Sequence, residues 1–298
     1  MRAAIVSRFG GPEAVEITEV PVPNPGPGQV RIKVAAAALN PVDAAMRAGV
    51  FGSAGEQVGL GWDVAGTVES VGDGVSRSPG ERVIGLATGH RTPLGTHAEY
   101  AILPADGIAP APMTLDDIHA AALPLNALSA AQALDMAALT PGQSLLVTGA
   151  AGGVGAHTVE LAHHRGLKVT ALASARDEEF LHSRGTNGFL PRDAALPASA
   201  FDGVIDTAML GDLALAPIRD GGAYIGVWPG QEPASERGIR VGALDVRADG
   251  TQLAELSELT DQGVVLARIA GTFSLADAAV AHARLTEGGL RGRIVLVP

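Results

Sequence analysis

The feature that most constrains the fold is a glycine-rich loop between a strand-like segment and a helix-like one. The apolar run Ser144–Thr148 is typical of a buried strand, and a helical pattern occupies residues 153–165. The loop and the first helical turn contain four glycines, Gly149, Gly152, Gly153 and Gly155. Glycines here permit a tight turn and let the backbone approach a pyrophosphate, while the helix N-terminus offers amide groups to the phosphates. The order of strand, loop and helix therefore predicts a dinucleotide-binding unit.

The loop departs from the strict G-x-G-x-x-G pattern, because Ala150 stands where the first glycine would be. An ordinary glycine turn in an α/β sheet is the alternative interpretation of the loop alone. The complete order of strand, loop, helix and second strand favours nucleotide binding over that alternative. We expect the cofactor to contact the residues of the loop and the first helical turn, namely Ala150, Ala151, Gly152, Gly153, Val154 and Gly155.

The second strand, at residues 168–172, indicates which dinucleotide the site prefers. Sites for NAD often carry an acidic residue about 20 residues after the fingerprint, which holds the ribose 2′-hydroxyl and would repel a 2′-phosphate. Here Ser174 and Arg176 follow the strand, and the nearest carboxylate, Asp177, is expected inside the next helix. A hydroxyl and a guanidinium suit a phosphate, so we predict NADPH or NADP+ as the cofactor. The alternative is that Ser174 and Arg176 merely open a surface helix.

Strands alternate with helices through the second half of the chain. The expected strands are 144–148, 168–172, 203–206 and 223–227. The expected helices between them are 153–165, 176–184 and 208–218. This order predicts an α/β fold with a doubly wound, Rossmann-type parallel sheet covered on both faces.

The remaining parts of the chain show a different pattern. The first third consists of short β-branched runs broken by glycine and proline. A helical stretch follows, with Thr114 as its expected N-cap and a break at Pro124. Towards the end of the chain we expect helices near 251–262 and 275–287 and a last strand at Arg293–Val297.

Composition excludes several classes of function. The length of 298 residues favours about two domains, and a net charge of −11 argues against a nucleic-acid partner. The chain has no apolar run long enough to span a membrane and no signal-peptide pattern at its N-terminus, so we expect a cytoplasmic protein. Because cysteine is absent, disulfides, thiol catalysis and thiolate-bound metals are excluded.

A series of motifs along almost the whole chain resembles one known family. The motifs are "ALNPVDAAMRAG" (38–49), "GWDVAGTVESVGDGV" (61–75), "GERVIGL" (80–86), "GTHAEYAILPA" (95–105), "AAALPLNALSAAQAL" (120–134), "GAAGGVG" (149–155) and "GLRGRIVLV" (289–297). In this order they resemble the zinc-free, zeta-crystallin-like quinone oxidoreductase branch of the medium-chain dehydrogenase/reductase superfamily. The resemblance implies a GroES-like catalytic domain with a partly open β-barrel (1–118 and 263–298), a Rossmann domain (119–262) and a cofactor in the cleft between them.

The resemblance also implies a reaction without a metal. In the alcohol dehydrogenases of the superfamily, Cys, His and Cys hold the catalytic zinc. The aligned positions here are Asn40, Trp62 and approximately Leu125, which are not a set of zinc ligands. We therefore expect no metal and expect hydride transfer from NADPH to a small-molecule electron acceptor, a quinone or an α,β-unsaturated carbonyl. Such acceptors delocalise the negative charge that develops, so the protein mainly orients the reactants and excludes water.

The same motifs supply four candidates for the catalytic site, each with a structural alternative. Asn40 is a candidate hydrogen-bond donor to the acceptor's oxygen, or a polar residue that satisfies loop backbone. Asp43 positions Asn40 or a ribose, although a helix cap is the favoured role. Trp62 forms an apolar wall at the nicotinamide or acceptor, or packs in the core. Ser129 occupies the position of the family's usual Thr near the nicotinamide, or is a helix-interior serine without a ligand.

Four further residues are candidate cofactor contacts. Gly226 and Val227 end a strand, and strand ends border the nucleotide crevice in such sheets. Arg192 is what remains of the family's Tyr-Arg pair at the 2′-phosphate, and Arg293 replaces its usual Lys as a phosphate or ribose contact or as a solvated charge. Residues 228–249 look short and polar compared with the region that often pairs subunits in the family, so the possible homodimer has altered edge pairing.

Two other functions remain open from the sequence. An enoyl-thioester reductase or a biosynthetic tailoring reductase would use the same cleft. A non-catalytic NADPH-binding sensor is the alternative from a different class, because the sequence shows no obvious proton donor.

Overall fold

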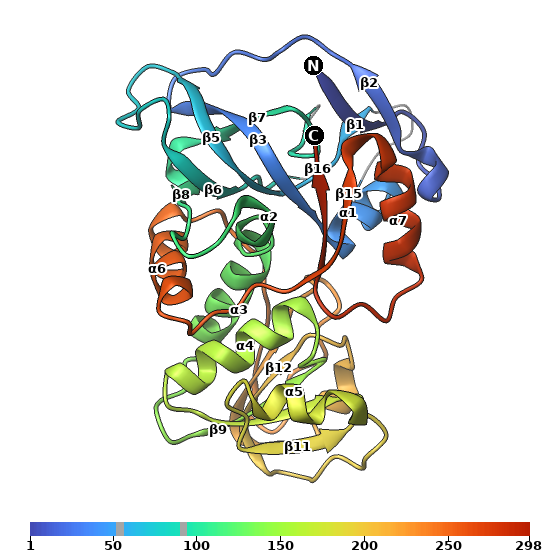
Figure 1. Cartoon of the computed structure of the whole chain (residues 1–298). Coiled ribbons are helices and arrows are strands. Elements are labelled where there is room, and N and C mark those ends of the chain that lie inside the picture. Colours follow the sequence, from blue (N-terminus) through green and yellow to red (C-terminus); the bar gives the residue numbers. More distant parts are fainter. Residues whose placement is uncertain (52–56, 90–93) are drawn as a thin grey trace. The chain divides into compact units, whose positions relative to one another are not determined.

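The computed structural model describes residues 1–51, 57–89 and 94–298 and divides the chain into two compact units (Figure 1). The first, called the barrel unit below, comprises Met1–Leu125, Arg247–Gly263 and Ala267–Pro298. The second, called the Rossmann unit, comprises Asn126–Val246 and Val264–Leu266. The helix at Gly250–Asp261 lies in the barrel unit, whereas the sequence placed the domain boundary after it, at residue 262.

The barrel unit is built around β3 (Gln29–Leu39), an unusually long strand for this chain. It pairs antiparallel with β5 on one side and, along its two halves, with β7 and β16 on the other. The larger sheet has the order β15-β16-β3-β5-β6-β8, and a smaller sheet has the order β2-β1-β4. The other strands are β1 (Arg2–Val6), β2 (Glu16–Glu19), β4 (Val58–Gly59), β5 (Asp63–Val71), β6 (Arg82–Leu86), β7 (Tyr100–Pro104), β8 (Ile108–Pro110), β15 (Ile269–Ser274) and β16 (Arg293–Val297).

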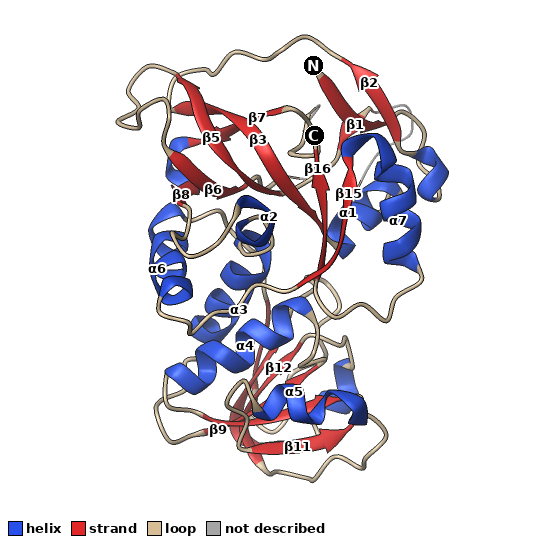
Figure 2. Cartoon of the chain, in the orientation of Figure 1, coloured by secondary structure: helices blue, strands red, loops and turns tan. Residues whose placement is uncertain are grey.

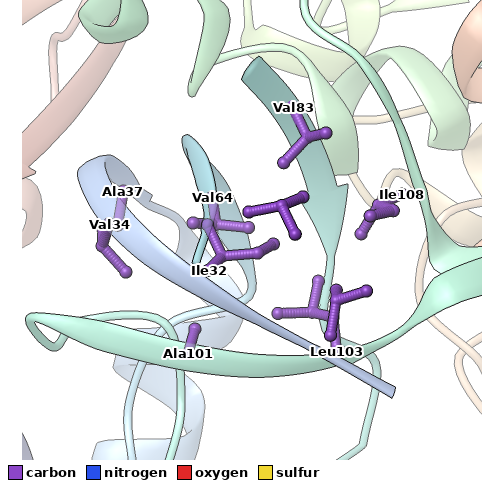
Figure 3. Packing of buried hydrophobic residues seen from close by; sticks show 10 residues of the cluster. Ile32, Val34, Ala37, Val64, Val83, Ala101, Leu103 and Ile108 are labelled. Carbon is purple, nitrogen blue, oxygen red and sulfur yellow. The ribbon is translucent and has the colours of Figure 1, made fainter. Parts of the chain in front are cut away.

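Alternation along these strands sends one set of side chains inward. Val30, Ile32 and Val34 of β3 are buried at every second position, as expected for a strand with one face on a core. Figure 3 shows Ile32, Val64, Val83, Leu103 and Ile108, from five different strands, gathered in one interior. Burial of this branched aliphatic cluster holds the strands of the barrel unit around a common centre.

Short helices surround the strands of the barrel unit. They are α1 (Pro41–Arg47), α2 (Asp117–Ala120), α6 (Gly250–Asp261) and α7 (Ala278–Thr286), with one-turn helices at Pro12–Ala14, Ala105–Gly107 and Leu275–Asp277. Figure 2 shows α7 beside α1 and beside strands β15 and β16. Among the described helices, none combines the length and the apolar content needed to cross a lipid bilayer.

The Rossmann unit is a six-stranded parallel sheet with the order β11-β10-β9-β12-β13-β14. Counted within the unit, this is the order 3-2-1-4-5-6 of dinucleotide-binding folds, which confirms the predicted fold class. The strands are β9 (Ser144–Thr148), β10 (Lys168–Ala173), β11 (Gly188–Pro191), β12 (Phe201–Asp206), β13 (Ile218–Gly226) and β14 (Arg240–Ala243). The helices are α3 (Pro124–Ala137, which begins in the barrel unit), α4 (Gly153–His164) and α5 (Glu178–His182), with one-turn helices at Ala175–Asp177 (η3) and Gly211–Ala214 (η4).

The helix predicted at residues 208–218 is wrong. Only η4 forms there, and β13 already begins at Ile218. Met209 and Gly211 both have φ of +57°, which interrupts a continuous α-helix over residues 208–218. The Asp206 carboxylate instead accepts the backbone amides of Ala208 (3.3 Å) and Gly211 (3.0 Å) and fixes a turn directly after β12. A core of apolar residues on this face of the sheet, including Leu215 of the connection, is therefore covered by loop segments.

Smaller differences concern caps and edge strands. Thr114 is not the N-cap of the helix that follows it, because Asp116 accepts the amide of His119 while Thr114 donates to Asp261. Five short strands were not expected from the sequence, namely β4, β8, β11, β14 and β15. Two of them, β11 and β14, are edge strands of four residues, whose brief patterns are weak signals.

The turn after β12 generates a stability prediction. The Tyr224 hydroxyl, which is buried, donates to Oδ2 of Asp206 (2.9 Å). Replacing Tyr224→Phe removes this bond and leaves a buried carboxylate oxygen with fewer donors, so we expect a loss of about 1–3 kcal/mol in unfolding free energy by urea denaturation. The control is Tyr100→Phe, whose hydroxyl bonds to no described residue. Equal losses in both variants would contradict a specific role for the Tyr224 bond.

Candidate functional site

The glycine loop adopts the backbone that its sequence predicts. Gly149 has φ of +59°, and the amide of Gly152 closes the turn by donating to the carbonyl of Gly149 (2.9 Å). Helix α4 begins immediately afterwards, with no side chain capping its first turn. A Cβ atom on Gly155 would overlap the carbonyl of Gly149 and the backbone of Ala150, so the helix packs on the turn only because residue 155 is glycine.

The hydrogen bonds of the loop show which amides are available to a ligand. The amide of Ala150 donates to the carbonyl of Leu172 (3.2 Å), and that of Gly152 is engaged with Gly149. These two residues, expected as cofactor contacts, therefore shape the turn rather than offer hydrogen bonds. The first-turn amides of an α-helix have no intrahelical acceptor, so Gly153, Val154 and Gly155 are the donors that α4 presents.

The other predicted cofactor residues of this unit lie at the same edge of the sheet. In the register, Thr148 lies opposite Leu172 and Asp206, and Ala173 lies opposite Pro191. The carboxyl ends of these parallel strands are therefore aligned, and the residues that follow them share this edge. These residues are Ser174 and Arg176 after β10, Arg192 after β11, and Gly226 and Val227 at the end of β13.

Charge at this edge is favourable for an anion. Arg176 and Arg192 are exposed, and Ser174 is half-buried at the start of η3. Asp177 is buried within η3, and its Oδ2 lies 4.0 Å from Nε of Arg176. Asp177 is therefore in a helical turn, as expected from the sequence, and the structure adds that its side chain is buried.

Sequence analysis missed a buried polar group beside the loop. The hydroxyl of Thr148 donates to Oδ1 of Asp206, and the hydroxyl of Thr207 donates to the carbonyl of Thr148. Thr207 lies against Gly149, where a Cβ would approach its Oγ1 to 2.8 Å. This group holds the loops after β9 and β12 together, and the available signal was an aspartate at the end of an otherwise apolar strand.

In the barrel unit, the structure brings together Asn40, Asp63 and Arg293 from three segments distant in sequence. Nδ2 of Asn40 donates to Oδ2 of Asp63 (2.6 Å), and Nη1 of Arg293 donates to Oδ1 of Asn40 (3.2 Å). Oδ1 of Asp63 accepts the amide of Leu125 (2.6 Å). The Asn40 amide is therefore held between a carboxylate and a guanidinium, and its side chain is fully buried.

Asp43 takes the structural role that the sequence favoured. Its Oδ2 accepts the amide of Asn40 (2.8 Å), which caps the start of α1, and its Oδ1 accepts the amide of Gly61 (3.1 Å). The carboxylate thus joins α1 to the chain that leads into β5. Any further contact of Asp43 with a ribose stays a prediction.

Burial dominates the electrostatics of this polar cluster, defined as Asn40, Asp43, Asp63 and Arg293. Burial raises the pKa of both carboxyl groups to about 7, against the lowering effect of their N–H donors and of the Arg293 charge. Burial also lowers the pKa of Arg293, which Asp63 and Asp43 raise. Two carboxyl groups share one guanidinium, so the ionisation of each depends on the other.

Of the remaining candidates, Trp62 and Ser129 lie outside the polar cluster and Arg293 belongs to it. Trp62 is buried, and its Nε1 donates to the sulfur of Met46 (3.2 Å), which gives the indole a place in the core of the barrel unit. Ser129 is buried on α3 in the Rossmann unit. Arg293 is a member of the polar cluster and not a solvated charge; its contact with a cofactor stays a prediction.

Comparisons with known proteins agree with this architecture. Residues 26–113 match the alcohol dehydrogenase GroES-like domain, and residues 176–296 match the zinc-binding dehydrogenase family. The chain is 31% identical to 2-methylene-furan-3-one reductase of Solanum lycopersicum over 88% of its length and 70% of that protein's. It is 30% identical to the chloroplastic NADPH-dependent alkenal/one oxidoreductase of Arabidopsis thaliana, over 100% and 80% respectively. The quinone oxidoreductase from Coxiella burnetii superposes with a TM-score of 0.91 at 28% identity, covering 100% of this chain and 99% of that one.

The second of these families is named for zinc binding, and the residues of this chain at the aligned ligand positions do not fit a zinc ion. The positions aligned with zinc ligands hold Asn40, Trp62 and approximately Leu125. The Asn40 amide is bonded to Asp63, the Trp62 indole N–H is bonded to Met46, and Leu125 bonds Asp63 through its backbone. None of these side chains is a thiolate or an imidazole. Within the described residues, no three histidine or acidic side chains gather as metal ligands.

The polar cluster predicts a particular dependence of stability on pH. The pKa of Asp63 is raised above its usual value near 4, so ionising this carboxyl group destabilises the folded protein. The stability that the protonated group contributes is fully present at low pH and is lost as the pH rises through 7. In Asp63→Asn this loss cannot occur, so its unfolding free energy should fall less steeply between pH 5 and pH 8. At pH 5 the variant should be about 1–3 kcal/mol less stable, since an amide cannot accept both N–H donors equally well.

Urea denaturation at the two pH values measures both effects. The exposed Asp73→Asn is the matched control, and its curves should follow those of the unmodified protein. Parallel pH dependence in Asp63→Asn and the unmodified protein would show that Asp63 does not titrate in the folded state over this range.

Proposed function

The chain belongs to the medium-chain dehydrogenase/reductase superfamily, and we propose that it is an NADPH-dependent, metal-free reductase of quinones or α,β-unsaturated carbonyls. Oxidoreductase activity with a nicotinamide cofactor follows from the family. The observation that carries the proposed cofactor is the sheet edge of the Rossmann unit, where the first-turn amides of α4 stand with Ser174, Arg176 and Arg192.

Selection of NADPH over NADH is proposed from charge. A 2′-phosphate carries negative charge and several acceptor oxygens, which exposed guanidinium groups bind through charge-assisted bonds. Arg176 and Arg192 follow adjacent strands in register, and the carboxylate next to Arg176 in the sequence, Asp177, is buried. The name of the Arabidopsis relative, which specifies NADPH, supports the same choice.

Two features of the site support a conjugated acceptor, which delocalises the developing negative charge over its own atoms. When bound, a reduced nicotinamide supplies the hydride. The described residues offer no ligand set for a metal that would polarise a carbonyl, and the Asn40 amide is already engaged by Asp63 and Arg293. The complete burial of the Asn40 side chain favours an architectural role over direct donation of a hydrogen bond to the acceptor's oxygen. Conjugated acceptors need less polarisation, so orientation and exclusion of water supply the greater part of catalysis.

Each turnover transfers one hydride and one proton to the acceptor. A quinone, NADPH and a proton give a hydroquinone and NADP+, and an enone gives the saturated ketone in the same way. The names of the tomato and Arabidopsis relatives, which specify reduction of a methylene-furanone and of alkenals or alkenones, support acceptors of the second class.

Consumption of NADPH with 9,10-phenanthrenequinone, a 2-alkenal and an enoyl thioester tests the proposal. We expect oxidation with at least one of the first two and none in Gly155→Ala, because a Cβ at residue 155 displaces the turn that presents the amides. Turnover restricted to the thioester would instead identify an enoyl-thioester reductase. Tight NADPH binding without turnover on any acceptor would identify a nucleotide sensor.

The proposed cofactor preference gives a direct mutational prediction. Arg176→Ala should weaken NADPH binding by about 1–3 kcal/mol, the usual value of a charge-assisted bond, and leave NADH almost unchanged. Isothermal titration with both nucleotides measures the difference. The control is Arg165→Ala, at the opposite end of α4 from the glycine loop, which should affect neither nucleotide. Equal weakening of NADPH and NADH in Arg176→Ala would show that this side chain does not contact the 2′-phosphate.

A further inference from the structure

Two buried histidines face each other in the barrel unit, and neither is among the residues assigned above to cofactor and acceptor. His97 lies in the segment before β7, and His282 lies on α7. Their ring centroids are 6.3 Å apart and the planes are inclined by 76°. His97 is 1% exposed and His282 is 0% exposed, so neither ring reaches bulk solvent.

The neighbours of His282 determine which ring nitrogen carries its proton. Nη1 of Arg47 lies 3.2 Å from Nδ1 of His282. A guanidinium has donors only, so Nδ1 must accept and the ring's proton resides on Nε2. His282 is therefore a neutral imidazole whose Nε2–H is a donor.

The same reasoning fixes His97 in a complementary state. Its Nε2 lies 3.0 Å from the carbonyl oxygen of Ala38. A carbonyl oxygen only accepts, so Nε2 of His97 carries the proton and Nδ1 presents a lone pair. One ring thus offers a buried donor and the other offers a buried acceptor.

Those two remaining atoms have no partner among the described residues. Nδ1 of His97 and Nε2 of His282 are both fully buried without a hydrogen bond, as is the hydroxyl of Thr96. Thr96 lies near the Cδ2 edge of the His97 ring, since a Cβ on Gly61 would approach Oγ1 of Thr96 and Cδ2 of His97 to the same 2.5 Å. Buried polar atoms of this kind are almost always bonded, and each one left unbonded would cost about 1–3 kcal/mol.

A direct bond between the rings does not satisfy these atoms. An N–H···N bond of about 3 Å would bring the centroids closer than the 6.3 Å observed. A buried water typically makes about three hydrogen bonds to such groups. One donor, one acceptor and one hydroxyl match a water molecule's two hydrogens and two lone pairs.

We propose that His97, His282 and Thr96 form a binding site for one internal water molecule. The water accepts from Nε2–H of His282, donates to Nδ1 of His97 and exchanges its third bond with the Thr96 hydroxyl. It completes a chain of bonds from Arg47 on α1, through His282 on α7, to the backbone of β3 at Ala38. Burial lowers the pKa of His97 to about 4 and that of His282 to about 3, which keeps both rings neutral near pH 7.

Nuclear magnetic resonance of the full chain labelled with nitrogen-15 histidine tests the site without altering it. At pH 7 we expect both rings as neutral Nε2–H tautomers and a cross-peak between the Nε2–H proton of His282 and a long-lived water. The His282→Phe variant assigns the signal by its loss, and His164→Phe, which alters an exposed ring, should leave it in place. Through-bond correlation to the backbone assigns the signal if His282→Phe does not fold.

Several outcomes would overturn the inference. A proton on Nδ1 of His282, a cationic ring at pH 7, or an Nε2–H signal lacking any cross-peak to water would each exclude the proposed bonds. A crystal structure at high resolution gives an independent check, because density for a water within about 3 Å of both ring nitrogens supports the site and direct packing of the rings contradicts it. Nicotinamide chemistry takes no part in this measurement, so its result is separate from that of the acceptor assay.

Discussion

The in-register parallel pairing of β9 with β10 and β12 is the constraint on which the nucleotide site depends. Because Thr148 lies opposite both Leu172 and Asp206, the three strands end at one level. The glycine loop, Ser174 and the Asp206 turn consequently share one edge at the point where the strand order reverses, which is where such sheets bind ligands. A slip of the register by one residue would reverse the facing of every side chain on the displaced strand and separate these groups.

The barrel unit depends on a different interaction, the neutralisation of buried charge. Asp43 and Asp63 receive four N–H groups in total, so neither carboxylate is left without donors, and the charge of Arg293 favours the ionised form of both. Removing one member of such a group leaves its partners buried and uncompensated, which is usually more costly than the net value of the interaction. The cluster joins β3, β5, α3 and β16 at their ends, and thus fixes where the chain's last strand returns to the sheet.

Sequence alone predicted the parts of the fold that strong local patterns encode. The glycine loop, β9 and β16 have their expected bounds, since continuous apolar runs and obligatory glycines leave little freedom. The 208–218 helix failed because the carboxylate of Asp206, just before the segment, accepts backbone amides and fixes a turn in place of a helix. Arg293 was predicted as a cofactor contact. Its hydrogen bond to Asn40 connects residues 253 positions apart, and no local pattern in the sequence reveals that contact. Histidine tautomers likewise depend on tertiary contacts, and the aspartate that ends an apolar strand indicated the Thr148–Asp206–Tyr224 group only as an isolated polar residue.

The connection between β12 and β13 has a consequence for how the Rossmann unit assembles. It links two parallel neighbours through residues 207–217, which form only the one-turn helix η4, where such crossovers ordinarily contain an α-helix. A shorter loop loses less chain entropy on closure, and pairings of low sequence separation form faster than distant ones. Gly203 pairs with Ala223 and Ala223 with Arg240, whereas the partner of Gly203 on β9 is the distant Leu145, so β12, β13 and β14 can form one unit before β9 joins it. A substitution that loosened this turn would slow refolding as well as weaken the native state.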